Sequence, residues 1–318
     1  MKNGPIELDG RTIEVSSAGK VFFPDAGVTK GDLVAYYRDV AGVTVPHLRD
    51  RPLTLQRFPD GLGGQGFFQQ DASDHFPAWV RRVPVERRGK GGTVGHVVAD
   101  DAATLVYLAN QAVVTFHAWT SRAGALDRPD LVVFDLDPDA GQGLDVVRAA
   151  ARAVRAAVEG VGLSPFVQTS GSKGFHVLAP LDGGADGEAV KAFARDLAAL
   201  VAAHDPGRLT VEWRKAKRAG RLLIDTNRNG YAQTVVAPYS VRARPGAPVA
   251  TPIDWHELGR AEPRSWTVAN LRRRLARKPD PWAGMEQHAR PFAPARERLD
   301  ELLAPAPGAR PAASRRRR

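Results

Sequence analysis

The stretch from residue 131 to residue 241 constrains the fold most, because apolar strands alternate in it with amphipathic helices. Residues 131–134 form a continuous apolar run, which is typical of a buried strand. Apolar residues at steps of three and four predict helices over residues 143–160 and around residues 190–200. Further strands are expected at residues 165–169, 175–181, 222–225 and 234–241. This order of elements predicts one sheet with helices packed on one face.

The first 120 residues predict a second set of shorter elements. Thr29 followed by Asp32 has the character of a capping box and opens a helix to about Val40. The Gly-rich residues 59–66 predict a loop. The other elements expected in this half are strands at residues 12–14, 21–23, 53–58, 96–99 and 112–118 and a helix at residues 101–111.

Two carboxylates follow the apolar run at residues 131–134. Asp135 and Asp137 are two residues apart, so they share one face of a strand, and Pro138 ends that strand. Two such carboxylates repel each other unless a cation lies between them, and hard divalent ions with oxygen ligands suit that position. The motif therefore indicates either a metal site or the solvated end of a strand.

A Gly-Ser-Lys turn separates the next two predicted strands. Its glycines let backbone N–H groups approach a ligand, while Ser170 and Lys173 suit phosphate oxygens. His176 begins the following strand. The spacing differs from that of a Walker loop, so this motif predicts either a phosphate contact or an ordinary hairpin turn.

A third carboxylate and an arginine pair follow further along. Asp225 ends another apolar strand, and is either a further metal ligand or a residue that initiates a turn. Arg242 and Arg244 lie two residues apart on the strand predicted over residues 234–241 and its end, so their guanidinium groups could grip a triphosphate or line a solvated edge. Together on one predicted sheet, these features make a two-metal site with a triphosphate clamp, as nucleotidyl transfer requires.

Composition narrows the class of partner and the compartment. The 318 residues carry a net charge of +10. This charge indicates a polyanionic partner such as nucleic acid, or a general preference for arginine. The chain has no cysteine, which excludes disulfides, zinc ribbons and thiol catalysis. It has no signal peptide and no run of about 20 apolar residues, so a cytoplasmic, nucleoid-associated protein without membrane contact is expected.

These motifs resemble those of the archaeo-eukaryotic primases. Asp135-Leu136-Asp137 is similar to their first motif, residues 170–176 to the second and Ile224-Asp225 to the third. The segments VTKGDL (28–33), FHAW (116–119), FDLDP (134–138) and APYS (237–240), with Arg242 and Pro245-Gly246, resemble the polymerase domain of the bacterial end-joining DNA ligase over residues 10–285. No ligase or phosphoesterase segment follows, so a standalone form is expected.

The resemblance implies an α+β fold with mixed and antiparallel central sheets, flanking helices and an RRM-like catalytic half. Residues 1–285 would form one primase-polymerase unit, and residues 286–318 a C-terminal helix and a disordered basic tail. Asp135, Asp137 and Asp225 would be catalytic and hold two Mg²⁺ or Mn²⁺ ions. The nucleotide would be bound by His117, near the sugar, and by Ser170, Lys173, His176, Arg242 and Arg244.

The resemblance also implies how DNA is held. Phe67 and Phe68 match an aromatic pair that stacks on the template, which needs no sequence preference. Lys20 and Lys30 match lysines that bind a 5′-phosphate across a gap. Gln70 stands where the family commonly has a lysine, and Ser16-Ser17 where it has an asparagine, which predicts a smaller preference for that phosphate.

The implied activity is templated nucleotide addition, with ribonucleotides preferred, at gaps and broken ends in end-joining repair, together with Ku and a DNA ligase. The alternative role is gap filling or priming in excision repair. Two other classes also remain: a phosphatase of the haloacid-dehalogenase type, and a DNA-binding module without activity. A phosphatase would leave the arginine pair without a role, which argues against the first class. In a module that only binds DNA, three carboxylates without a cation would weaken binding, which argues against the second.

Overall fold

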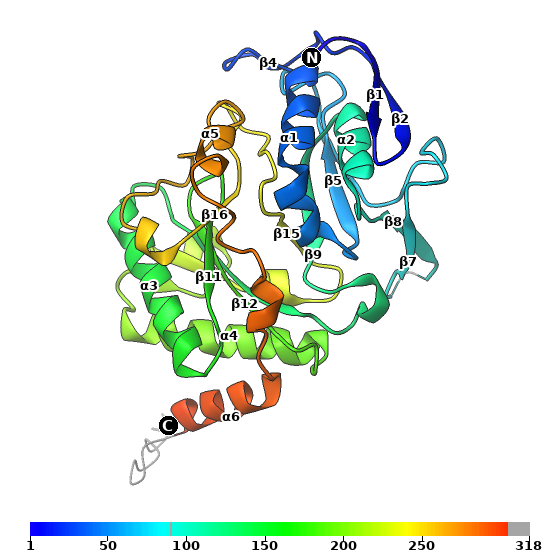
Figure 1. The fold of residues 1–318 in the computed structure, drawn as a ribbon. Helices are drawn as coiled ribbons and strands as arrows, with labels where there is room; N and C mark the ends of the chain where they lie inside the picture. The colour runs from blue at the N-terminus through cyan, green and yellow to red at the C-terminus, as the bar shows by residue number, and fades with distance from the viewer. Residues whose placement is uncertain (90, 305–318) are drawn as a thin grey trace.

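The computed structural model describes residues 1–89 and 91–304 and contains two main sheets (Figure 1). The larger one is six-stranded, in the order β13-β14-β10-β12-β11-β16. Only β13 and β14 pair in parallel. The strands are β10 (Leu131–Asp137), β11 (Phe166–Thr169), β12 (Phe175–Pro180), β13 (Leu209–Thr210), β14 (Leu222–Asp225) and β16 (Thr251–Ile253).

Two helices connect the central strands of this sheet. Helix α3 (Leu144–Gly160) follows β10 and helix α4 (Gly187–His204) follows β12. Apart from the two-residue strand β13, which precedes β14, the chain order is β10-α3-β11-β12-α4-β14. With the spatial order β14-β10-β12-β11, it makes a split β-α-β motif. The expected RRM-like half and the α+β class are therefore confirmed.

Side-chain alternation along β10 decides which face carries polar groups. Phe134 and Leu136 pack in one core with residues of α3 and α4. Val133 points to the opposite face, where it packs near Val235 and Trp282. Because the period of a strand is two, Asp135 and Asp137 share the face of Val133, away from the helices.

The second sheet has four strands in the order β15-β9-β5-β6, and helices α1 and α2 pack against it side by side (Figure 1). Its elements are β5 (Leu53–Arg57), β6 (Phe67–Gln69), β9 (Val113–Trp119), β15 (Thr234–Val236), α1 (Lys30–Leu48) and α2 (Ala102–Asn110). The remaining pairs are β1 (Gly4–Leu8) with β2 (Arg11–Val15), β3 (Val21–Phe23) with β4 (Val28–Thr29), and β7 (Arg82–Glu86) with β8 (Thr93–Val97). Two further helices are α5 (Leu271–Leu275) and α6 (Phe292–Leu303).

The capping box that opens α1 is confirmed. The Thr29 side chain accepts a hydrogen bond from the Asp32 N–H, and the Asp32 carboxylate accepts one from the Thr29 N–H. The helix runs eight residues beyond its predicted end at Val40 and includes Pro46. Burial of Val45 and Leu48 in the core outweighs the low helix propensity of this last stretch.

The prediction of a strand over residues 234–241 in the larger sheet is wrong. The strand ends at Val236 and belongs to the second sheet, where it pairs with β9. Pro238 lacks an N–H, and Tyr239 has φ of +62° and donates its N–H to the carbonyl of Ala250, so the chain turns there. The strand predicted over residues 96–99 is also displaced, since β8 covers Thr93–Val97.

Ion pairs and a buried polar network hold the two main sheets and their helices together. Arg51 donates two hydrogen bonds to Asp130, at 2.7 and 2.8 Å. Asp280 accepts from the Tyr239 hydroxyl at 2.6 Å and lies 2.7 Å from Nε2 of His47 in α1. Burial alone would raise the pKa of Asp280, but the hydrogen bonds and charge of His47, with Tyr239, lower it.

Helix α6 packs on α4 through the rings of Phe292 and Phe193, and Arg296 pairs with Asp196. The boundary between residues 285 and 286 stays a prediction, and the predicted disordered tail beyond Ala304 lies outside the described residues. Within residues 1–89 and 91–304, every helix is too short or too polar to cross a membrane.

The contacts of Asp280 can be tested for their contribution to the stability of the fold. We expect Asp280→Ala to lower the free energy of unfolding by about 3 kcal/mol, because it strips the buried His47 and Tyr239 groups of their acceptor. Denaturant unfolding measures this change. Asp300→Ala, which removes an exposed ion pair on α6, is the control and should change stability by less than about 1 kcal/mol. Equal effects of both variants would contradict the role of this network.

Candidate active site

One row of directly opposed residues crosses the larger sheet. The antiparallel register pairs Asp225 of β14 with Asp135 of β10, Asp135 with His176 of β12, and His176 with Gln168 of β11. Directly opposed residues project from the same face, so these four side chains lie side by side on the face away from α3 and α4. Two of the predicted catalytic carboxylates are neighbours for this reason.

A cavity of about 240 Å³ opens over three residues of this row, Asp225, Asp135 and His176. Both sheets contribute to its walls, since His117 comes from β9 and Thr234 from β15. The lining residues are His117, Asp135, Leu136, Asp137, Ser170, Ser172, Lys173, Gly174, His176, Asp225, Arg228, Thr234, Val235, Val236 and Arg242. The structure thus brings together every predicted catalytic and nucleotide-binding residue except Arg244.

Hydrogen-bond donors and arginine side chains surround the central carboxylate, Asp135. Its Oδ1 lies 3.3 Å from Nε2 of His176, and its Oδ2 lies 3.8 Å from Nε of Arg228. Burial alone would raise the pKa of Asp135, but the interactions with His176, Arg228 and Arg242 outweigh it and lower that pKa. The carboxylate is therefore ionised at neutral pH.

The other two carboxylates also contact donors of the chain. Asp137 accepts a hydrogen bond from Nη1 of Arg218 at 2.9 Å. Asp225 accepts one from the N–H of Asn227 at 2.8 Å, and Nη2 of Arg228 lies 3.9 Å from its Oδ2. Among the described residues, no three acidic or histidine side chains converge closely enough to form a closed metal site. The donor set itself, carboxylate oxygens on two adjacent strands, suits Mg²⁺ or Mn²⁺.

The Gly-Ser-Lys turn forms a tight hairpin beside these carboxylates. The Ser170 hydroxyl accepts hydrogen bonds from the N–H groups of Ser172 and Gly174, at 3.1 and 3.2 Å, and it retains a hydrogen to donate. A Cβ atom at Gly174 would lie 1.8 Å from the carbonyl oxygen of Leu136, so glycine alone permits this approach to β10. Lys173 is exposed at the cavity wall.

His117 and Arg242 lie on the side of the cavity that faces the second sheet. Burial, together with the charges of Arg242, Arg228 and His176, lowers the pKa of His117 to about 3, so this imidazole is neutral. Burial and the neighbouring Arg244 and Arg228 lower the pKa of Arg242 to about 10, which still leaves it cationic. Arg242 also donates to the carbonyl of Ser170 at 3.1 Å and thus ties the two walls together.

The prediction that Arg242 and Arg244 share one strand face is wrong. The chain makes a three-residue turn here, with the Arg244 N–H bonded to the Arg242 carbonyl at 2.8 Å. Arg242 therefore faces the cavity, while Arg244 is exposed and does not line it. The sequence interpretation missed Arg228, Arg218 and Gln168. Of these three, only Arg228 could have been found from the sequence, because it follows Asp225 by three residues in a short turn.

The two predicted template-stacking residues lie on the edge strand β6. Phe67 is 45% exposed and Phe68 is 62% exposed, which is unusual for side chains of this size. The Arg57 guanidinium lies over the Phe67 ring, 5.6 Å from its centroid. The Phe68 ring centroid lies 5.7 Å from that of His117, so this exposed surface reaches the cavity.

The two predicted phosphate-binding lysines lie close together but differ in exposure. Lys30 is the first residue of α1 and only 6% exposed, and its Nζ donates to the carbonyl of Ser16 at 2.7 Å. Burial and the charge of Lys20 lower the pKa of Lys30. Lys20 is more exposed, and its Nζ bonds to Pro59 O and Asp60, both at 2.7 Å.

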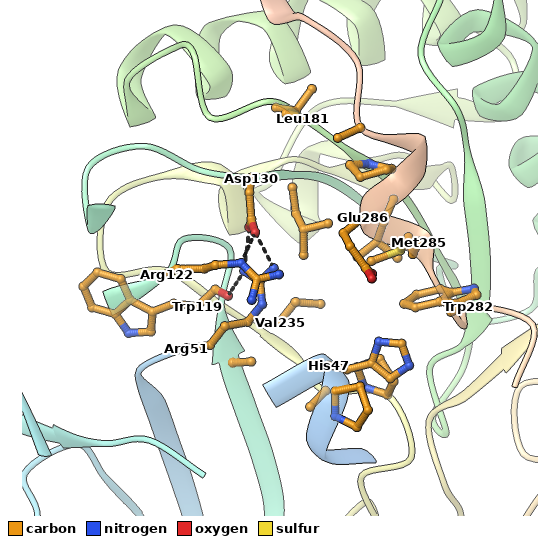
Figure 2. A pocket seen from close by; sticks show the side chains of 18 of the residues that line it. His47, Arg51, Trp119, Arg122, Asp130, Leu181, Val235, Trp282, Met285 and Glu286 are labelled. Atoms are coloured by element: carbon orange, nitrogen blue, oxygen red, sulfur yellow. Dashed lines mark hydrogen bonds and ion pairs between the residues drawn. The ribbon is translucent and has the colours of Figure 1, made fainter. Parts of the chain in front are cut away.

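A second cavity, of about 260 Å³, lies on the other side of β15 and shares Val235 and Val236 with the first. Figure 2 shows Asp130 between Arg51 and Arg122 at one wall, with Trp282 and Met285 at the other. None of the predicted site residues lines this cavity, and most of its wall is apolar.

The comparisons agree with the resemblance found in the sequence. Residues 29–282 match the family model described as LigD, primase-polymerase domain. The multifunctional non-homologous end joining DNA repair protein LigD of Mycobacterium tuberculosis is 34% identical over 276 residues, which cover 84% of this chain and 36% of that protein. The LigD protein of Pseudomonas aeruginosa is 32% identical over 275 residues, covering 85% of this chain and 32% of that protein. This chain therefore spans about a third of the length of these curated relatives.

A solved structure matches over nearly its whole length. The polymerase domain from Mycobacterium tuberculosis ligase D, in complex with DNA, superposes with a TM-score of 0.81 at 32% identity, covering 87% of this chain and 99% of that chain. The family model covers most of the chain, and the same fold holds the motifs found in the sequence. The chain belongs to the LigD primase-polymerase domain family, a family of nucleotidyltransferases.

Proposed function

We propose that this chain is a template-dependent primase-polymerase that adds nucleotides to DNA by two-metal nucleotidyl transfer. The observation that carries the proposal is the cavity in which Asp135, Asp137 and Asp225 face a Gly-Ser-Lys turn and the half-buried Arg242. Carboxylates for cations and cationic groups for a triphosphate are the two requirements of this reaction. Family membership argues against a phosphatase of the haloacid-dehalogenase type and against a DNA-binding module without activity.

Asp135, Asp137 and Asp225 are the residues that would hold the divalent ions, Mg²⁺ or Mn²⁺. When bound, these ions would neutralise the triphosphate and activate the primer 3′-hydroxyl. Asp135 is ionised without them, so it is ready to act as a ligand at neutral pH. Arg218 and Arg228 contact the same carboxylates and balance their charge in the free protein.

Donors on both walls of the cavity would bind the incoming nucleotide. Lys173, Ser170 and His176 lie on the catalytic sheet, and Arg242 closes the cavity from the other side. Arg242 keeps its charge and is held by the Ser170 carbonyl, so it is oriented before the nucleotide arrives. His117 is neutral, and it would contact the sugar without adding charge.

The exposed aromatic pair would hold the template base next to this cavity. Phe68 lies beside His117, so a base stacked on Phe68 would be adjacent to the nucleotide sugar. Every base has a π-face, so this contact suits a polymerase that must accept any template sequence.

The biological role follows from the relatives and is part of the proposal. The relatives are non-homologous end joining proteins, and the solved polymerase domain was bound to DNA. We infer that this chain extends gapped or broken DNA ends with a preference for ribonucleotides, in cooperation with Ku and a DNA ligase. Gap filling or priming in excision repair is the alternative role, and the 5′-phosphate contact below distinguishes the two.

Asp137→Ala tests the reaction. We expect primer extension to fall about a thousandfold or more, because a lost metal ligand removes roughly 4 kcal/mol of transition-state stabilisation. Binding of primer-template DNA should stay unchanged or tighten slightly, because a negative charge is removed. Asp145→Asn, an exposed carboxylate in the first turn of α3, is the control and should retain activity. Near wild-type extension by Asp137→Ala would refute the catalytic assignment.

A downstream 5′-phosphate tests the end-joining role. Lys20 and Lys30 lie together at the start of α1, where the helix N-terminus adds positive potential. We expect the phosphate to tighten binding of gapped DNA by about 1 kcal/mol per lysine contact, or roughly fivefold each, with less gain at higher salt. Gln70 keeps this gain below that of a protein with a third lysine.

The measurement is a titration of gapped DNA with and without the phosphate, at two salt concentrations. Lys30→Ala should erase most of the gain, whereas Lys191→Ala on the distant helix α4 should preserve it. Thermal unfolding of Lys30→Ala separates a lost contact from a lost fold, since Lys30 is buried. Equal affinity for both DNAs in the wild type at low salt would favour gap filling or priming over end joining.

A further inference from the structure

Gln168 is a fully buried amide at the inner end of the cross-strand row. Its exposed fraction is 0%. Its side-chain Nε2 lies 3.1 Å from Nδ1 of His176 and 3.3 Å from the main-chain oxygen of Val236 in β15. This one side chain therefore connects the second sheet to the histidine that contacts Asp135.

The Val236 carbonyl fixes the orientation of this amide. A main-chain oxygen only accepts hydrogen bonds, so the NH₂ end of Gln168 must face it. The reversed amide would place two oxygens at the same short distance, which is repulsive. The NH₂ group carries a second hydrogen, and this one is directed at His176.

The orientation of the amide determines where the proton of a neutral His176 resides. Nδ1 faces an N–H donor, so Nδ1 must be the acceptor and Nε2 carries the hydrogen. Nε2 lies 3.3 Å from Oδ1 of Asp135. The imidazole therefore directs an N–H at the ionised carboxylate. In the other tautomer, a lone pair would face that negative charge.

The oxygen of the Gln168 amide shows that this arrangement costs stability. Within residues 1–89 and 91–304, its Oε1 is buried and has no hydrogen-bond partner. A buried acceptor without a donor destabilises a fold, and an apolar side chain of equal length would avoid the loss. Departures of this kind are expected where a residue serves a functional site.

We propose that Gln168 is a positioning residue, which holds His176 in the tautomer protonated at Nε2 so that it donates a hydrogen bond into the active-site cavity. In the free protein the acceptor is Asp135. During the reaction the same N–H is available to a phosphate oxygen of the nucleotide, and this second part rests on the proposed function.

The tautomer can be read directly from ¹⁵N NMR of the histidine side chains. The wild-type protein is labelled at histidine and measured without metal, DNA or nucleotide, and His176→Asn identifies the signals of His176. We expect Nδ1 to give the shift of an unprotonated nitrogen and Nε2 that of a protonated one. A proton on Nδ1 would overturn the proposal. Because no substrate is present, this outcome is separate from a failure of the polymerase assignment.

Two substitutions of equal length then test the consequence. Gln168→Met removes the donor, and Gln168→Glu replaces it with an acceptor that demands a proton on Nδ1. We expect Gln168→Met to lose the single tautomer and Gln168→Glu to reverse it, and both to raise the KM for nucleotide about tenfold with a smaller change in DNA affinity.

Thr115→Val is the matched control. Thr115 is also fully buried, and its hydroxyl has no partner among the described residues, but this residue of β9 does not line the cavity. It should leave the His176 signals and the KM unchanged. An unchanged tautomer in both Gln168 variants would overturn the positioning role, and a reversed tautomer with wild-type KM would overturn its link to nucleotide binding. If neither variant folds, the wild-type spectrum alone decides.

Discussion

The antiparallel register of β10 with its two neighbours is the constraint on which the rest of the site depends. It places Asp135 directly between Asp225 and His176. A slip of one residue would turn Asp135 and Asp137 into the core beneath α3 and α4. The register is held because Phe134 and Leu136 are buried in that core. Hydrophobic packing on one face of the sheet thus fixes the polar chemistry of the other.

Charge balance is the second condition that the site meets. Three carboxylates this close would repel one another, and a ring of cationic and polar donors offsets them in the free protein. Arg228 lies between Asp135 and Asp225, and Arg218 pairs with Asp137. Arg242 is half-buried in the wall and still cationic. A cavity with both signs of charge matches a reaction that brings divalent cations and a polyphosphate together.

The second sheet completes the site, although the catalytic carboxylates all lie on the first sheet. It supplies His117 to the cavity wall, and β15 carries the carbonyl that orients Gln168. The buried pairing of Arg51 with Asp130 and the contacts of Asp280 hold this sheet against the first one. Residues outside the lining of the cavity therefore help to hold its two walls together.

The sequence predicted the catalytic sheet well where its signals were local. The apolar run before Asp135 and the helical spacing over residues 143–160 depend on neighbouring residues alone, and both elements are present. Short strands such as β6, β13 and β16 were missed, because two or three residues carry no periodicity and form only through distant pairing.

The same physical reason explains the errors at the site. Which sheet β15 joins depends on its pairing with β9, more than 100 residues away along the chain, so Arg244 was placed on the wrong surface. Gln168 and Arg218 gain their roles from contacts across the fold, with Val236 and Asp137. The carboxylates and the Gly-Ser-Lys turn were found because each lies within one short motif.

Template-directed addition is the most direct measurement of the central claim. Four gapped duplexes that differ only in the templating base would each be incubated with Mn²⁺ and with each ribonucleotide in turn. The account predicts that every duplex is extended chiefly by the complementary nucleotide. Addition of all four nucleotides at equal rates on every template, or no addition on any, would contradict it.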